Sequence, residues 1–93
     1  MTLPEEELKF IRLIERSIGT GIPLVSDLYS YTLGYTIKDN HVEGLGLFSC
    51  ELRSVPEKIN VLSSLKRLLI RGNKLRVLPE ELFLLMSLES LDL

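Results

Sequence analysis

The sequence predicts an α/β repeat fold preceded by an N-terminal cap made of a helix and a β-hairpin. Three patterns in the 93 residues support this prediction. Apolar residues recur at helical spacing over 4–18, alternate with polar residues over about 31–38, and recur at one fixed offset from residue 42 onward. These patterns divide the chain into a cap over 1–41 and a repeat region over 42–93.

Composition limits the class of protein. A chain of 93 residues is one domain near the small end of what folds alone, and its hydrophobic content of 45% favours a packed core. Eleven basic and thirteen acidic residues give a net charge of −2. Because the chain carries no excess of positive charge, we expect neither nucleic acid nor an anionic membrane as a partner.

The cysteine content and the N-terminus indicate a cellular compartment. The single cysteine, Cys50, has no partner for an internal disulfide, which fits a reducing environment. The N-terminus carries acidic residues at 5–7 where a secretory signal has basic and then apolar residues. No apolar stretch approaches the roughly 20 residues of a membrane helix. We therefore predict a cytoplasmic protein.

Residues 4–18 are expected to form an amphipathic helix. Pro4 suits a first turn, the acidic residues 5–7 suit the positive end of the helix dipole, and Gly19 follows where a helix commonly ends. We expect the apolar stripe to cover the open end of the core; docking on a membrane or a partner helix is the alternative. The stripe consists of Leu8, Phe10, Ile11, Leu13, Ile14 and Ile18.

Residues 31–38 and 42–48 are expected to pair as an antiparallel hairpin, in one of two registers. A three-residue loop pairs Lys38 with Val42, and further along it places Tyr35 opposite Leu45. A two-residue loop instead places Tyr35 opposite Gly44, where an aromatic ring can cover the glycine. We favour the first register because it buries the large residues together.

From residue 42 the chain repeats itself with an offset of 23 (65 − 42 = 23). This offset defines two units, 42–64 and 65–87, and a partial third, 88–93. One unit cannot bury its apolar face alone, whereas stacked neighbours bury it together. The first unit's positions are Val42, Leu45, Leu47, Cys50, Leu52, Val55, Pro56, Ile59 and Leu62; their equivalents are Leu65, Leu68, Ile70, Asn73, Leu75, Leu78, Pro79, Leu82 and Leu85.

Residues 65–79 read L-x-x-L-x-L-x-x-N-x-L-x-x-L-P, so residues 42–93 resemble leucine-rich repeat proteins of the intracellular 23-residue type. The resemblance implies a short solenoid, with a parallel sheet on its concave side and short helices or 3₁₀ turns on its convex side. It also implies that Asn73 lies inside and bonds to backbone groups of adjacent coils, and that Cys50 is a small buried thiol. The hairpin resembles the N-terminal caps of plant-type repeat proteins, although the cysteines that usually flank those caps are missing.

The concave sheet of such proteins binds other proteins, so we expect the outward residues of the sheet to contact a partner. Arginine and aromatic residues are the types that most often anchor interfaces. The alternative is that these charges only neutralise one another. The predicted contact residues are Phe48, Lys66, Arg67, Leu69, Arg71 and Asp92. The predicted ladders are Glu43–Lys66–Glu89, Gly44–Arg67–Ser90, Gly46–Leu69–Asp92 and Phe48–Arg71.

A basic stretch over 58–76 indicates a second possible surface, suited to an anionic partner such as an acidic peptide. Catalysis has no comparable support. His41 is the only histidine, no acid pair is spaced as in a catalytic cleft, and 19–21 lacks the lysine of a phosphate loop. We expect no enzyme activity, metal or cofactor.

The sequence therefore predicts a non-catalytic protein-interaction module. The alternative is a structural N-terminal part of a longer signalling or scaffold repeat protein, with little binding of its own; a regulatory segment of an enzyme is a third hypothesis. The end of the repeat region bears on this choice, since Leu88, Leu91 and Leu93 would expose an apolar edge. Either further repeats or self-association would cover that edge.

Overall fold

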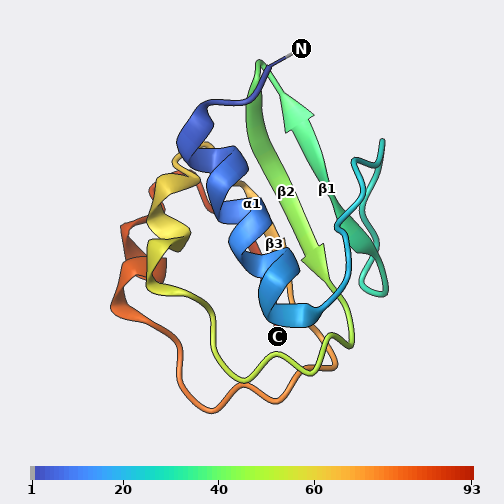
Figure 1. The fold of residues 1–93 in the computed structure, drawn as a ribbon. Helices are drawn as coiled ribbons and strands as arrows, with labels where there is room; N and C mark the ends of the chain where they lie inside the picture. The colour runs from blue at the N-terminus through green and yellow to red at the C-terminus, as the bar shows by residue number, and fades with distance from the viewer. Residues whose placement is uncertain (1) are drawn as a thin grey trace.

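A four-stranded mixed sheet organises the molecule, and helices cover one of its faces (Figure 1). The computed structural model describes residues 2–93. The strands lie side by side in the order of the chain. The elements are α1 (Glu5–Ile18), β1 (Leu33–Lys38), β2 (His41–Leu47), β3 (Arg67–Leu69) and β4 (Ser90–Asp92), with two 3₁₀ helices, η1 (Glu57–Val61) and η2 (Glu80–Leu84).

The predicted fold class, a short leucine-rich-repeat solenoid, is wrong. β1 runs antiparallel to β2, whereas β2, β3 and β4 are parallel, so the sheet is mixed. The molecule measures 33 × 25 × 22 Å and does not extend along a repeat axis. The N-terminal helix and hairpin determine the architecture, because α1, β1 and β2 contain 14, 6 and 7 residues. The repeat strands β3 and β4 contain only three residues each.

The 23-residue offset did predict the strand register correctly. Gly44 pairs with Arg67, which pairs with Ser90, and two residues further along each strand Gly46 pairs with Leu69, which pairs with Asp92. The 3₁₀ helices obey the same offset, since each follows a proline and η1 contacts η2.

Helix α1 confirms the predicted helix to within one residue and ends as expected. Gly19 adopts φ +76°, a left-handed conformation that suits glycine, and its N–H donates to the carbonyl of Glu15 at 2.9 Å. The buried face is narrower than the predicted stripe, because Leu8 and Leu13 remain exposed. The residues that α1 buries are Glu7, Phe10, Ile11 and Ile14.

The hairpin combines the two predicted registers. Asp39 and Asn40 both have positive φ and form a two-residue turn, so Lys38 pairs with His41. A β-bulge at Glu43 then shifts the pairing by one residue, which places Tyr35 opposite Leu45 as the three-residue alternative required. The favoured partners of the large residues are therefore confirmed, but the predicted loop is wrong.

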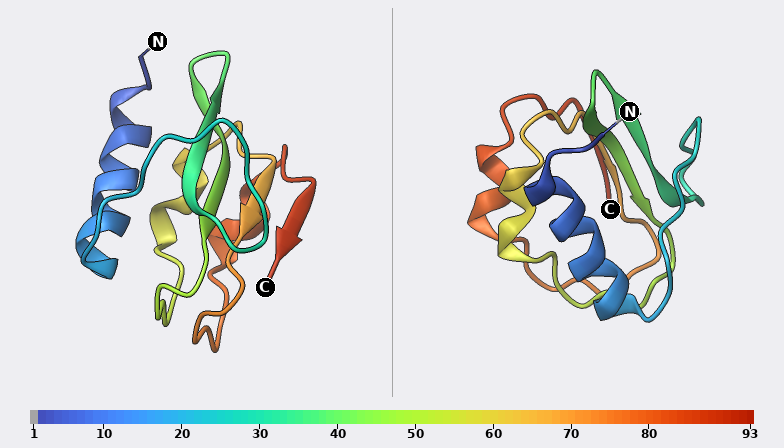
Figure 2. Two further views of the ribbon diagram at one scale, coloured as in Figure 1. Left: turned by 90° about the vertical axis from the view of Figure 1, so that its right-hand side faces the viewer. Right: turned by 45° about the horizontal axis from the view of Figure 1, so that its top comes forward.

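The core lies between the sheet and the layer formed by α1, η1 and η2 (Figure 2). Leucines of β2 and β3 point into it from the sheet, and Phe10 and Ile14 enter from α1. Over residues 2–93 no helix combines the length and apolar character needed to cross a membrane.

Candidate protein-binding surface

The face of the sheet opposite the helices is partly covered by residues 23–32, here called the covering segment (Figure 2). Its Leu28 is only 2% exposed and lies on the hairpin. A Cβ atom on Gly44 would lie 2.6 Å from Cδ1 of Leu28, and one on Gly46 would lie 2.7 Å from the carbonyl oxygen of Thr32. The strand glycines therefore allow the covering segment to lie directly on the sheet.

The covering segment is also bonded to the outer edge of β1. Val25 donates its N–H to the carbonyl of Tyr35 at 2.9 Å, and Tyr35 donates its N–H to the carbonyl of Pro23 at 3.0 Å. Leu24 forms an isolated parallel bridge with the same tyrosine. The hairpin thus has neither a free outer face nor a free edge here, which leaves β3 and β4 as the open part of the sheet.

A shallow groove of about 530 Å³, here called the outer groove, lies over β3 and β4 beside the covering segment. Three of the predicted contact residues line it: Arg67, Leu69 and Asp92. The complete lining is Leu28, Tyr29, Ser30, Tyr31, Arg67, Leu69, Ser90, Leu91 and Asp92.

Two tyrosines that sequence reasoning missed form one wall of the outer groove. The rings of Tyr29 and Tyr31 stack with their centroids 5.8 Å apart and their planes 12° apart, yet they remain 55% and 69% exposed. Both rings belong to a turn over residues 29–32. Thr32 holds this turn by donating its N–H to the carbonyl of Tyr29 at 3.0 Å and by accepting the N–H of Tyr29 on its Oγ1 at 2.9 Å. The period-two alternation continues through this turn, so it assigned Tyr31 to a strand that begins only at Leu33.

Arg67 is partly a structural residue. Its Nη2 donates to the carbonyl of Leu28 at 2.8 Å, and its Nη1 lies 4.0 Å from Oδ1 of Asp27. The guanidinium therefore ties the covering segment to β3 while about a third of the side chain stays exposed. Leu69 lies beside it but is only 6% exposed, so it forms the floor of the groove and little contact area.

The remaining predicted contact residues do not gather at one point. Arg71 bonds to Oδ1 of Asp92 through Nη2 at 3.1 Å and Nε at 3.3 Å, an exposed pair contributing about 0–1 kcal/mol. Phe48 follows β2 and lies outside the outer groove, and Lys66 precedes β3 and does not line it. The basic stretch over 58–76 likewise divides among three surfaces: the outer groove, η1 and the loop beside Arg53.

Asn73 is half-buried and makes backbone hydrogen bonds of the kind that the family resemblance implied. Its Oδ1 accepts the N–H groups of Cys50 and Leu52, each at 2.9 Å, and its Nδ2 donates to the carbonyls of Leu47 at 2.6 Å and Ile70 at 2.9 Å. The equivalent residue Cys50 is half-buried, and this burial raises the pKa of its thiol, which disfavours the reactive thiolate.

His41 and Glu7 form a contact that the sequence did not reveal. The carboxylate of Glu7 is buried; its Oε2 lies 2.7 Å from Nδ1 of His41, and its Oε1 accepts the N–H of Val42 at 2.8 Å. Glu7 therefore joins α1 to the tip of the hairpin, in addition to its place near the helix start. No cluster of three potential metal ligands exists within residues 2–93.

No protein-family model matches this sequence, and neither a curated protein nor a solved structure matches it significantly.

Proposed function

We propose that this protein is a non-catalytic interaction module that binds a protein partner in the outer groove. The observation that supports the proposal best is the stacked, exposed pair Tyr29 and Tyr31 beside Arg67, whose side chain is about one-third exposed. Tyrosine and arginine are enriched among the residues that dominate binding energy.

The arrangement suits binding because its parts are already held in place. Stacking fixes the two rings against each other, and the bond from Arg67 to the carbonyl of Leu28 holds their segment on the sheet. The side chains of the outer groove would therefore lose little conformational entropy when a partner docks. We also propose a cytoplasmic location, supported by the unpaired, half-buried Cys50.

The test is quantitative capture of proteins from cell extract by the purified chain, followed by an affinity measurement on each captured protein. Replacement of Tyr29 and Tyr31 by alanine should weaken binding by about 30-fold or more, since anchor residues contribute about 2 kcal/mol or more. The matched control replaces Phe83 and Met86, exposed apolar residues on the η2 side, and should bind normally. Undiminished binding by the tyrosine variant would refute the proposal.

A second candidate function is structural and is favoured by the edge strand β4. One edge of the sheet is covered by the bridge from Leu24 to Tyr35, whereas β4 pairs with β3 alone among the strands described. Leu91 and Leu93 are exposed at this edge. We propose that further polypeptide covers it, either in a longer scaffold protein of which residues 1–93 are a structural part, or through self-association.

A further inference from the structure

We propose that a second groove, between α1 and η1, binds an amphipathic helix of a partner that carries acidic residues around one large apolar side chain. This groove, here called the helix groove, has a volume of about 470 Å³. Its lining residues belong to α1 and η1, and none of them lines the outer groove. Figures 1 and 2 show these two helices on the same face of the sheet. None of the predicted contact residues of the sheet belongs to it.

The floor of the helix groove is apolar. Among its lining residues, Phe10 is buried, Val61 of η1 is half-buried and Leu13 is 37% exposed. Leu13 belongs to the apolar stripe of α1, yet the core buries the neighbouring Ile14 instead. The groove therefore presents an apolar position that the molecule's own packing leaves open.

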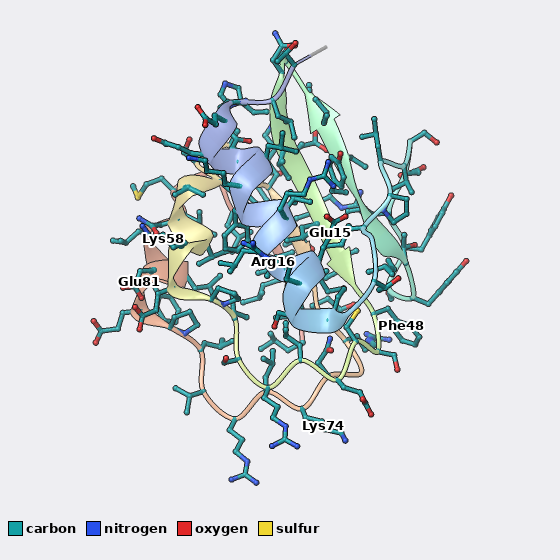
Figure 3. All side chains as sticks on the ribbon, in the orientation of Figure 1. Glu15, Arg16, Phe48, Lys58, Lys74 and Glu81 are labelled. Atoms are coloured by element: carbon teal, nitrogen blue, oxygen red, sulfur yellow. The ribbon has the colours of Figure 1, made fainter. Side chains whose placement is uncertain are left out.

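The rim of the helix groove is basic. Lys9 precedes Leu13 by four residues and Arg16 follows it by three, so all three lie along one face of α1. Lys58 of η1 lines the same groove, and Figure 3 labels it on η1 and Arg16 on α1. Glu6 is the one acidic residue in the lining.

These charges are largely free to meet a partner. Lys9 makes only an exposed pair with Glu5, at 3.3 Å, and neither Arg16 nor Lys58 pairs with an acidic residue in the part of the chain that the structure describes. Three cations against one acid give the groove a local charge of +2 (3 − 1 = 2), on a chain whose net charge is −2. The local excess opposes the overall charge and selects an acidic partner.

The shape favours a helix over a membrane surface. Lys9 and Arg16 are seven residues apart, which spans about 10.5 Å, or roughly two helical turns. A partner helix laid along α1 can therefore place an apolar residue on Leu13 and acidic residues one turn to either side of it. A membrane would require several exposed apolar residues, and the groove offers only Leu13 above its buried floor.

The probe is a fluorescein-labelled helical peptide with a single leucine flanked by glutamates at positions three and four away, followed by fluorescence anisotropy. The comparison peptide has glutamine in place of every glutamate. We expect saturable binding of the acidic peptide, weakened about tenfold or more by Arg16→Glu with Lys58→Glu, and further reduced at high salt. Arg53→Glu with Arg76→Glu makes the same charge change at a different surface and should bind within about twofold of wild type.

Four results would overturn the proposal. They are no binding of the acidic peptide, equal binding of the glutamine peptide, an equal loss in the Arg53/Arg76 control, and preferential binding to vesicles of anionic phospholipid. Leu13→Ala tests the apolar contact and should weaken peptide binding while the circular dichroism spectrum stays that of wild type. The alanine variant of Tyr29 and Tyr31 should bind the peptide normally, so failure of the outer groove and failure of the helix groove are distinguishable.

Discussion

Single polar side chains hold together segments that are far apart in the sequence. Asn73 bonds to the backbone of residues 47–52 and of Ile70, and its position was recognisable because the repeat pattern marks it. Glu7 does the same between α1 and the hairpin tip, at a separation of 35 residues from Val42. No local sequence pattern predicts the contact between Glu7 and Val42, because the contact depends on where α1 packs against the sheet. Residue roles within the repeat region were therefore predictable, whereas those between α1 and the hairpin were not.

Thr36 provides a prediction at the same scale. Its Oγ1 is buried without a hydrogen-bond partner in residues 2–93, an arrangement that costs about 1–3 kcal/mol. Thr36→Val keeps the shape of the side chain and removes the unsatisfied hydroxyl. We expect the free energy of unfolding to rise by about 1 kcal/mol in urea denaturation.

The control for this prediction is Thr32→Val, which removes an oxygen that accepts the N–H of Tyr29. That variant should be less stable than wild type. A Thr36→Val protein that is destabilised like the Thr32→Val protein would show that the hydroxyl of Thr36 is satisfied in solution.

At the scale of elements, the periods of the sequence predicted α1 and the hairpin well, because α1 buries one face and the hairpin alternates large with small or polar residues. They could not separate the strand from the turn that holds Tyr29 and Tyr31, since alternation alone does not show where pairing begins. The bulge at Glu43 was equally hidden, because both candidate registers satisfied the alternation and the structure uses each in a different part of the hairpin. The outer groove was consequently predicted with its arginine but without its aromatic wall.

The hydrogen bonds of Glu15, near the end of α1, predict that the stability of the protein depends on pH. The N–H of Ile22 donates to Glu15 at 2.7 Å, and Arg12 donates to it at 2.9 Å; together these bonds lower the pKa of Glu15 from its ordinary value of 4.5. The unfolded chain then binds more protons in acid than the folded chain. The stabilisation is complete above that ordinary value and is lost as the pH falls through the lower pKa of the folded state.

The measurement is the midpoint of urea unfolding for wild type and for Glu15→Gln, over a series of pH values above and below 4.5. Wild type should lose more stability on acidification than Glu15→Gln, and the two proteins should converge in strong acid. Glu89→Gln, at an exposed position, serves as the control and should follow wild type. Equal acid sensitivity of wild type and Glu15→Gln would contradict the prediction.

At the scale of the whole molecule, the repeat offset correctly described the parallel half of the sheet and misled about the architecture. It carried no information on residues 1–41, which add an antiparallel strand, cover the outer face of the hairpin and close one edge. The two ends of the sheet therefore differ. The β1 edge is bonded to residues 23–25, whereas β4 presents an edge strand with exposed leucines.

This asymmetry predicts self-association through β4. We expect sedimentation velocity to show a species whose size grows with concentration, because an unpaired edge strand beside apolar side chains favours pairing with another chain. Leu93→Glu should raise the dissociation constant about tenfold or more, since it puts a charge into the joined edge. Met86→Glu, a change of the same kind at an exposed residue away from β4, should associate as wild type does. A monomer at every concentration would refute this prediction.

The covering segment has a consequence for which substitutions the chain can tolerate. Besides Gly44 and Gly46, Gly34 has no room for a side chain, since a Cβ there would lie 2.8 Å from Cγ1 of Val25. A side chain at any of the three would lift the segment that carries Tyr29 and Tyr31. The sequence requirements of the outer groove therefore extend to three positions outside its lining, and we expect a larger residue at any of them to disturb the groove.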